Sequence, residues 1–202
     1  MAGVRRGLTA AAVACALAVC ALAAAPSQAG AGRSVPQGFA GMVVEGPVLE
    51  PKVANLGHEM DLMVRSGVES IRFVFPWADE QPYANWQQVP QGKQSRYRDV
   101  NGVPTDFDYT DRIVGQAAQR GLAVLPVVWQ APDWGAREPG NQASPPKSPE
   151  AIAQYAGALV ARYGPNGSFW AENPGLTKQP IETWQIWNEP NIIPFWKDQP
   201  FA

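Results

Sequence analysis

Cysteine is almost absent from this sequence. The two cysteines, Cys15 and Cys20, both lie in an alanine-rich stretch near the start of the chain. A mature chain beginning near Gly30 has no thiol, which excludes disulfides, thiolate catalysis and a cysteine-ligated zinc site. Its stability must then come from apolar side chains buried in a core.

Metal-ligand clusters, phosphate-binding loops and a surplus of positive charge are missing as well. His58 is the only histidine, and no group of His, Asp and Glu has the spacing of a metal site. Neither GxGxxG nor a phosphate-loop lysine is present, so we expect no metal and no cofactor. Because 16 basic residues stand against 18 acidic ones, nothing favours a phosphate backbone, and nucleic acid is not an expected partner.

The first 29 residues have the pattern of a secretory signal peptide. Arg5 and Arg6 precede an apolar run at residues 8–25, and Ser27-Gln28-Ala29 places small residues where signal peptidase requires them. The alternative is a membrane anchor, for which an alanine-rich run of this length is borderline. We therefore expect a secreted, extracellular protein formed by residues 30–202, with no membrane contact after cleavage.

Tryptophan and proline are abundant, with eight Trp and twenty Pro in 202 residues. This composition predicts long, structured loops that carry aromatic side chains. Aromatic rings can stack on the C–H faces of sugars, so carbohydrate is a candidate ligand. Several of these rings must also belong to the core.

Residues 30–202 alternate between strand-like and helix-like segments. The strand-like segments are short and apolar, at residues 39–45, 68–75, 122–128 and 181–187. The third is a nearly continuous apolar run, which is typical of a parallel sheet buried on both faces, although Pro126 removes a hydrogen-bond donor from it. Strands that alternate with helices predict an α/β fold with a parallel sheet and right-handed crossovers.

Three helices are predicted between these strands. The first begins after Asn55, the second at Asp106 or Asp108, and the third after Ser148, and a glycine can end each of them. Their spacing predicts an apolar face on each helix that packs against the sheet. These faces are formed by Leu56, Met60, Met63 and Val64, by Ile113, Val114, Ala117 and Ala118, and by Ile152, Tyr155, Ala156, Leu159, Val160 and Tyr163.

The loops that follow the second and third strands are long and rich in Trp, Tyr, Pro and Gln, at residues 76–105 and 129–147. The first two connections from helix back to strand are short, whereas the third, at residues 165–180, is longer. Elaborate loops at the carboxyl ends of strands are typical of (β/α)8 barrels, whose active sites these loops form.

The strongest local motif is WQIWNEPN at residues 184–191, an apolar strand that ends in an amide, a carboxylate and a proline. Pro190 disfavours helical geometry at Glu189. A carboxylate flanked by indole rings loses hydration, so we expect a raised pKa for Glu189, as a general acid at neutral pH requires. The alternative is a turn in which Asn188 or Glu189 caps a following helix.

Arg72 is predicted to point into the barrel interior. Ile71, Phe73 and Phe75 alternate with it and would pack under the helices. A buried guanidinium needs a carboxylate or a sugar oxygen as partner, so Arg72 belongs either to a structural ion pair or to a site. Asn188 and Glu189 cannot both face inward on a regular strand, so the fourth strand must become irregular there.

Residues 186–191 resemble the fourth-strand motif of clan A, the large superfamily of retaining glycoside hydrolases with a (β/α)8 barrel. The resemblance covers about residues 39–196, because residues 68–77 are similar to the family's second strand and residues 129–134 to its aromatic loop after strand three. It implies that Glu189 is the catalytic acid/base, that Asn188 binds the sugar 2-hydroxyl and that Arg72 holds the nucleophile in place.

The other loop residues are interpreted more simply. Trp77, Trp129 and Trp134 are the candidates for stacking on a carbohydrate substrate, whereas Trp86 and Trp170 are expected to anchor loops. We expect His58 to be a packing or surface residue. Asp79 and Glu80 are expected to lie in a solvated loop.

The resemblance implies a nucleophilic glutamate at the end of a seventh strand, in a barrel of about 250 residues. The 202 residues would then hold only about the first four β/α units and no nucleophile. We expect the complete protein to be a cellulase-like or β-xylosidase-like glycosidase that hydrolyses O-glycosyl bonds in a poly- or oligosaccharide. The alternatives are a secreted, non-catalytic carbohydrate-binding protein and a non-functional truncated product.

Overall fold

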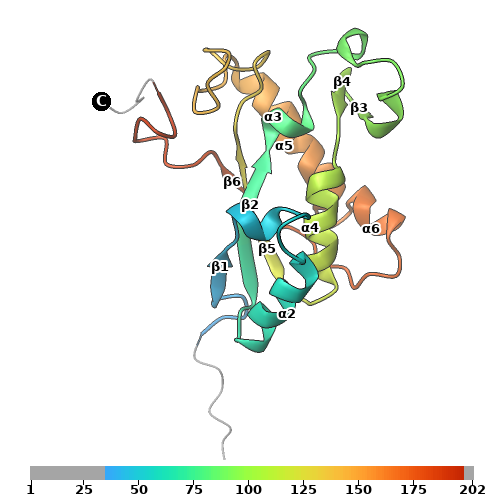
Figure 1. Ribbon diagram of the computed structural model, residues 1–202, viewed down its shortest axis with the longest axis vertical. Helices are drawn as coiled ribbons and strands as arrows, with labels where there is room; N and C mark the ends of the chain where they lie inside the picture. Colours follow the sequence, from blue (N-terminus) through green and yellow to red (C-terminus); the bar gives the residue numbers. More distant parts are fainter. Residues whose placement is uncertain (1–34, 198–202) are drawn as a thin grey trace, which may run out of the picture. The chain divides into compact units, whose positions relative to one another are not determined.

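The computed structural model describes residues 35–197 of the chain. These residues contain a four-stranded parallel sheet. Its strands lie side by side in the order β1 (Gly41–Val43), β2 (Ser70–Pro76), β5 (Ala123–Trp129) and β6 (Gln185–Ile186) (Figure 1). Each neighbouring pair is parallel. The predicted α/β fold with a parallel sheet is therefore confirmed. The signal-peptide prediction for residues 1–29 lies outside the described residues.

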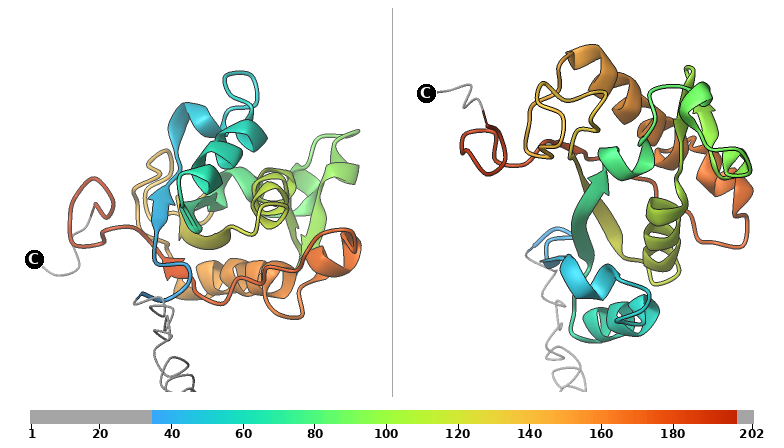
Figure 2. Two further views of the ribbon diagram at one scale, coloured as in Figure 1. Left: turned by 90° about the horizontal axis from the view of Figure 1, so that it is seen from below. Right: turned by 45° about the horizontal axis from the view of Figure 1, so that its top comes forward.

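Three long helices connect the strands, and the views in Figure 2 show them on the same side of the sheet. The Asn55 side chain caps the first by accepting a hydrogen bond from the amide of His58 (3.2 Å), and Ser148 caps the third through the amide of Ala151 (3.3 Å), both as predicted. The second begins at Asp108, whose amide donates to Asp106 (3.0 Å). These helices are α2 (Leu56–Arg65), α4 (Asp108–Ala118) and α5 (Pro149–Tyr163).

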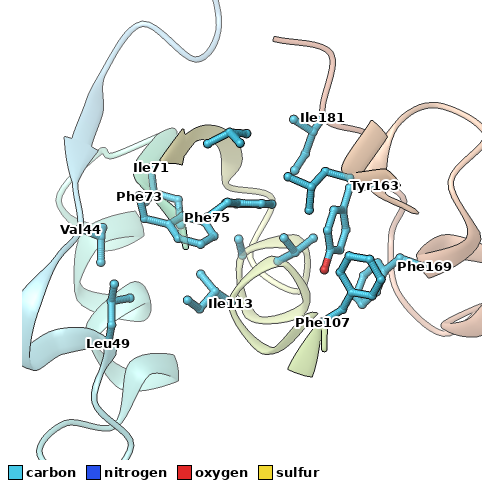
Figure 3. Close-up of a cluster of buried hydrophobic side chains, with 14 of the residues drawn as sticks. Val44, Leu49, Ile71, Phe73, Phe75, Phe107, Ile113, Tyr163, Phe169 and Ile181 are labelled. Carbon is cyan, nitrogen blue, oxygen red and sulfur yellow. The ribbon is translucent and has the colours of Figure 1, made fainter. Parts of the chain in front are cut away.

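The core lies between these helices and the sheet. Ile71, Phe73 and Phe75 are buried and point toward the helical layer, where the rings of Phe75 and Tyr163 meet edge to face with centroids 5.7 Å apart (Figure 3). Arg72, which alternates with them, is only partly buried. The predicted two faces of the second strand are therefore confirmed.

The apolar helix faces are narrower than predicted. Val64 and Val160 are 39% and 45% exposed, so their assignment to the core is wrong. The positions just before them, Met63 and Leu159, are buried instead. Each valine lies one residue, or about 100° of helix rotation, beyond its buried neighbour and therefore faces solvent.

The two outer strands are shorter than predicted. β1 has three residues and β6 has two, whereas the sequence pattern predicts strands at 39–45 and 181–187. β6 ends because the next residue, Trp187, adopts a left-handed φ of 68°, which an extended strand cannot continue. Pro126 lies in β5 opposite Phe73, before Val127, where pairing with β6 begins. Its missing N–H therefore removes no ladder bond on the β6 side.

The long loop after β2 contains a hairpin that the sequence analysis missed. Strands β3 (Arg98–Val100) and β4 (Val103–Thr105) pair in antiparallel fashion around Asn101 and Gly102. Both turn residues have positive φ, 52° and 87°, as a type I′ turn requires. The Asn-Gly pair was the available signal.

Several short helices complete the chain. Most lie in the loops at the carboxyl ends of the strands, but α6 lies in the third helix-to-strand connection and explains its length. They are η2 (Gly46–Leu49), α3 (Trp77–Glu80), η3 (Trp86–Gln88), η4 (Gln94–Arg96) and α6 (Ser168–Glu172).

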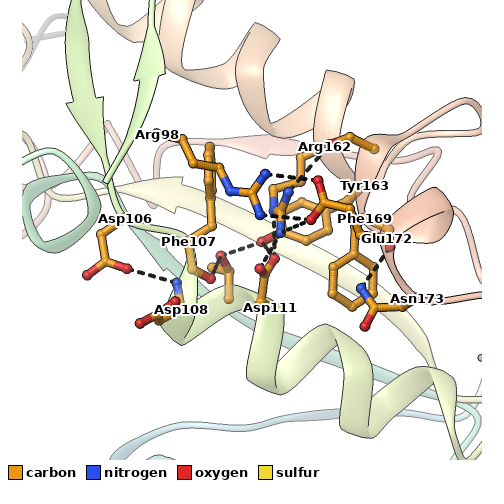
Figure 4. Close-up of polar contacts among 12 residues, drawn as sticks. Arg98, Asp106, Phe107, Asp108, Asp111, Arg162, Tyr163, Phe169, Glu172 and Asn173 are labelled. Atoms are coloured by element: carbon orange, nitrogen blue, oxygen red, sulfur yellow. Dashed lines mark hydrogen bonds and ion pairs between the residues drawn. The ribbon is translucent and has the colours of Figure 1, made fainter. Parts of the chain in front are cut away.

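A polar cluster joins α4, α5, α6 and the hairpin (Figure 4). Arg162, on α5, is almost fully buried, and it pairs with Asp111 of α4 and with Glu172 of α6. Glu172 in turn accepts two hydrogen bonds from Arg98 of β3, at 2.9 and 2.8 Å. The cluster therefore fixes the hairpin and α6 to the helical layer.

The outer strands of the sheet expose apolar side chains. Met42 and Val43 on β1 are 44% and 54% exposed, and Ile186 on β6 is 51% exposed. Within residues 35–197, no further strand pairs with the outer edge of either one. Exposed apolar edge strands favour pairing with other chains.

We therefore expect residues 30–202, expressed alone, to self-associate. Size-exclusion chromatography with light scattering should show dimers or larger species, and Val43→Lys combined with Ile186→Lys should shift the population toward monomer, because charge on an edge strand opposes pairing. A monomeric unsubstituted segment at high concentration would show that the edges do not associate.

Candidate active site at the carboxyl ends of the strands

Non-glycine residues with a positive φ lie where β5 and β6 end. Gln130 directly follows β5 and has φ 67°, while Trp187 and Glu189 follow β6 with φ 68° and 38°. The other non-glycine residue with positive φ in the described part of the chain is Asn101 in the hairpin turn. Such conformations cost about 1–3 kcal/mol each and persist only when the surroundings impose them, often at functional sites.

Arg72 contacts one residue of β6 and one residue that follows it. Its Nη2 donates to Asn188 Oδ1 (2.8 Å), and its Nε donates to Gln185 Oε1 (3.1 Å). The structure thus brings together two residues that are 116 positions apart and that the resemblance places in one site. The partners of Arg72 among the described residues are amides, so the structural ion pair considered for it is not formed there.

Glu189 is exposed, and its carboxylate makes no hydrogen bond or ion pair within residues 35–197. The predicted desolvation by flanking indole rings is therefore wrong for this chain. The reason is local, because the buried Trp187 ring turns away and donates its N–H to the carbonyl of Phe195. No helix follows among the described residues, so Glu189 is not a helix cap either.

Trp77 does not fit the role of a sugar-stacking residue, and that prediction is wrong. Its ring is fully buried, stacks on Tyr155 with centroids 5.9 Å apart, and meets Trp134 edge to face at 5.8 Å. The one-turn helix α3 begins directly after β2 and directs this ring into the core.

Trp129 and Trp134 remain the candidates for stacking, and both are partly buried. Trp129 ends β5 and packs edge to face against Phe195 with centroids 5.1 Å apart. Trp134 donates its N–H to the carbonyl of Gln81 (2.7 Å). Both rings lie in or next to the loop that follows β5.

Gln81 connects the two long loops. Its side chain accepts a hydrogen bond from Trp77 Nε1 (2.8 Å) and donates one to Thr105 (2.8 Å), while its carbonyl accepts the one from Trp134. A further backbone bond joins Ala78 N to Gln130 O (2.8 Å). The loops after β2 and β5 are therefore hydrogen-bonded to each other at two points, through Gln81 and Trp134 and through Ala78 and Gln130.

Trp86 and Trp170, which are expected to anchor loops, each make a hydrogen bond to another segment of the chain. Trp86 donates its N–H to Asp99 of the hairpin (2.6 Å), and the buried Trp170 donates to the carbonyl of Tyr163 (3.0 Å). His58 is exposed in the first turn of α2, which agrees with the expected surface position.

Sequence reasoning missed a buried carboxyl group. Glu80 was expected in a solvated loop but is 1% exposed, and it accepts hydrogen bonds from Thr110 Oγ1 (2.6 Å) and Tyr155 OH (2.7 Å). Burial raises the pKa of Glu80 to about 8, against the opposing effect of these two bonds. The spacing of Trp77, Glu80 and Gln81 on one helical face was the available signal.

Glu80 belongs to the helical layer rather than to the Arg72 face. Its two hydrogen-bond donors come from α4 and α5, and Thr110 is bonded in turn to Tyr163 OH (2.6 Å).

Within residues 35–197, no group of three His, Cys, Asp or Glu side chains could hold a metal ion. No helix in the same range is long and apolar enough to cross a membrane.

No family model and no curated protein matches this chain. Among solved structures it is similar to the GH39 enzyme from Xanthomonas axonopodis pv. citri, a glycoside hydrolase family 39 enzyme, with 17% sequence identity and a TM-score of 0.44. The similarity covers 82% of this chain and 30% of that one, so the chain spans less than a third of that enzyme's length.

Proposed function

We propose that this chain is part of a secreted, retaining glycoside hydrolase and contributes the first four strands of a (β/α)8 barrel. In this proposal Glu189 is the catalytic acid/base, Asn188 binds the sugar, and Arg72 holds Asn188 in place. Trp129 and Trp134 are proposed to stack on substrate. We assign no nucleophile within residues 35–197.

The observation that carries the proposal is the hydrogen bond between Arg72 and Asn188. It places the amide of a WNEP sequence beside an arginine of the second parallel strand, at the carboxyl end of the sheet. Active sites of α/β barrels lie at this end of the strands. The strained backbone of Trp187 and Glu189 lies at the same place and supports the same location.

The strand order also supports a barrel. Each parallel strand of the sheet lies next to the one that precedes it, in the order β1-β2-β5-β6. A (β/α)8 barrel is wound in this way, whereas a doubly wound sheet reverses direction partway. The helices on one side of the sheet and the partly polar face around Arg72 agree with that arrangement (Figure 2).

The geometry indicates how Asn188 would act. Arg72 occupies Oδ1 of the amide, and an amide nitrogen carries two donors, so Nδ2 is the end available to a sugar hydroxyl. Fixing the amide in advance avoids an ordering cost when the transition state forms. Glu189, one residue later and exposed, is free to approach the glycosidic oxygen and protonate it.

The test is Glu189→Gln in the complete secreted protein. Turnover should fall by about 10²–10⁴-fold on oligosaccharides and on glycosides with poor leaving groups, because protonation of the leaving oxygen is lost. Activated aryl glycosides need little protonation and should lose much less. Steady-state kinetics across a series of leaving groups measures the difference.

Glu182→Gln is the matched control, because Glu182 is exposed and lies on the segment just before β6. Its kinetics should equal those of the unsubstituted protein. If Glu189→Gln keeps the activity of the unsubstituted protein on both kinds of substrate, the acid/base role is refuted. Oligosaccharide binding without any turnover would instead favour a carbohydrate-binding protein.

A further inference from the structure

Trp187 is held in its strained conformation from both ends of its backbone. Its N–H donates to Val128 O of β5 (2.8 Å), and its carbonyl accepts a hydrogen bond from Gln185 Nε2 (2.9 Å). An aromatic residue with φ 68° needs such support, because only glycine adopts this conformation readily. The Gln185 side chain therefore fixes the peptide that leads into Asn188.

The same glutamine also contacts Arg72. Its Oε1 accepts from Arg72 Nε (3.1 Å), while Arg72 Nη2 donates to Asn188. The contacts form a closed ring that runs from Arg72 through Gln185 and the Trp187 carbonyl to Asn188 and back. Each residue in this closed set of hydrogen bonds restrains the next one. Glu189 is the residue that follows Asn188 in the sequence.

We propose that Gln185 is a positioning residue that sets the orientation of Asn188 and Glu189. The role needs an acceptor toward Arg72 and a donor toward the Trp187 carbonyl in one side chain, which an amide of this length provides. An ionised glutamate keeps only the acceptor, and methionine keeps neither. The inference rests on the proposed function, since the residues that Gln185 positions are its proposed acid/base and sugar-binding groups.

The experiment compares Gln185→Glu and Gln185→Met in the complete protein. We expect kcat on poor leaving groups to fall by about 10-fold for Gln185→Glu and about 100-fold for Gln185→Met, with KM changed less than about 3-fold. The loss should shrink for activated aryl glycosides, because Gln185 acts through Glu189. A residue that only stabilises the fold would lower activity on both kinds of substrate equally.

Gln154→Met is the matched control, because Gln154 is exposed on α5. Crystal structures give a readout that does not need activity. In Gln185→Met, Trp187 should leave the left-handed region, and Asn188 Oδ1 should move out of hydrogen-bond range of Arg72. If Gln185→Met does not fold, the kinetics and the crystal structure of Gln185→Glu take its place, because glutamate has nearly the same shape as glutamine.

The outcomes separate this inference from the proposed function. If Glu189→Gln shows the leaving-group effect but both Gln185 variants keep wild-type kcat, only the positioning role is overturned. If Glu189→Gln shows no effect, the proposed function fails, and the crystal structures still decide whether Gln185 holds the ring together. An unchanged Trp187 conformation in Gln185→Met would overturn the inference.

Discussion

Arg162→Met is expected to lower the free energy of unfolding by about 3–5 kcal/mol. The Arg162 guanidinium is buried, pairs with Asp111 and Glu172, and lies 5.0 Å from the ring centroid of Phe107 (Figure 4). Removing the cation leaves the partly buried Asp111 carboxylate without its counter-charge, while Glu172 keeps Arg98. Urea unfolding followed by circular dichroism measures the loss.

The control is the double variant Arg162→Met with Asp111→Leu. Replacing both members of a buried pair by apolar residues is often far less harmful than removing one, so the double variant should regain a large part of the stability. If the free energy of unfolding of Arg162→Met falls by less than about 1 kcal/mol, the ion pairs of Arg162 contribute no more than ordinary surface pairs.

The stability of the folded chain is expected to fall as the pH rises from about 4.5 to about 8, through Glu80. Glutamate titrates near 4.5 in the unfolded chain, whereas burial raises the pKa of Glu80 to about 8 in the folded one. Over this interval the folded chain holds a proton that the unfolded chain has released. The effect amounts to about 1.4 kcal/mol per pH unit at most.

Glu80→Gln isolates this effect, because an amide of the same shape does not titrate. Urea unfolding of both proteins at several pH values should show the variant gaining stability relative to the unsubstituted protein as the pH rises. The other groups that face Glu80 are Thr110, Tyr155 and, through their charges, Asp106 and Asp111, and all are present in both proteins. A stability difference that does not change with pH would rule out a raised pKa.

Local signals in the sequence predict much of this fold. Asn55 and Ser148 cap their helices because their side chains reach backbone amides three residues ahead, a contact that needs no tertiary information. The alternation of Ile71 and Arg72 assigns the two faces of β2 for the same reason. Such features depend on neighbouring residues and can be read without the structure.

The errors concern side chains whose surroundings are built by distant segments. Glu80 and Trp77 read as loop residues, but α3 turns them toward α4 and α5, which follow much later in the chain. The early end of β6 depends on a left-handed φ at Trp187, and nothing in a tryptophan predicts that conformation. The exposure of Glu189 likewise depends on where the Trp187 ring goes.

The bonds around Gln81 have a consequence for engineering this protein. Because Gln81 and its neighbours tie residues 76–105 to residues 130–147, the two loops should move as one body when a ligand binds. Grafting one loop from another enzyme would leave Trp134 and Gln130 without their partners. A change of specificity by loop exchange would therefore have to transplant both loops together.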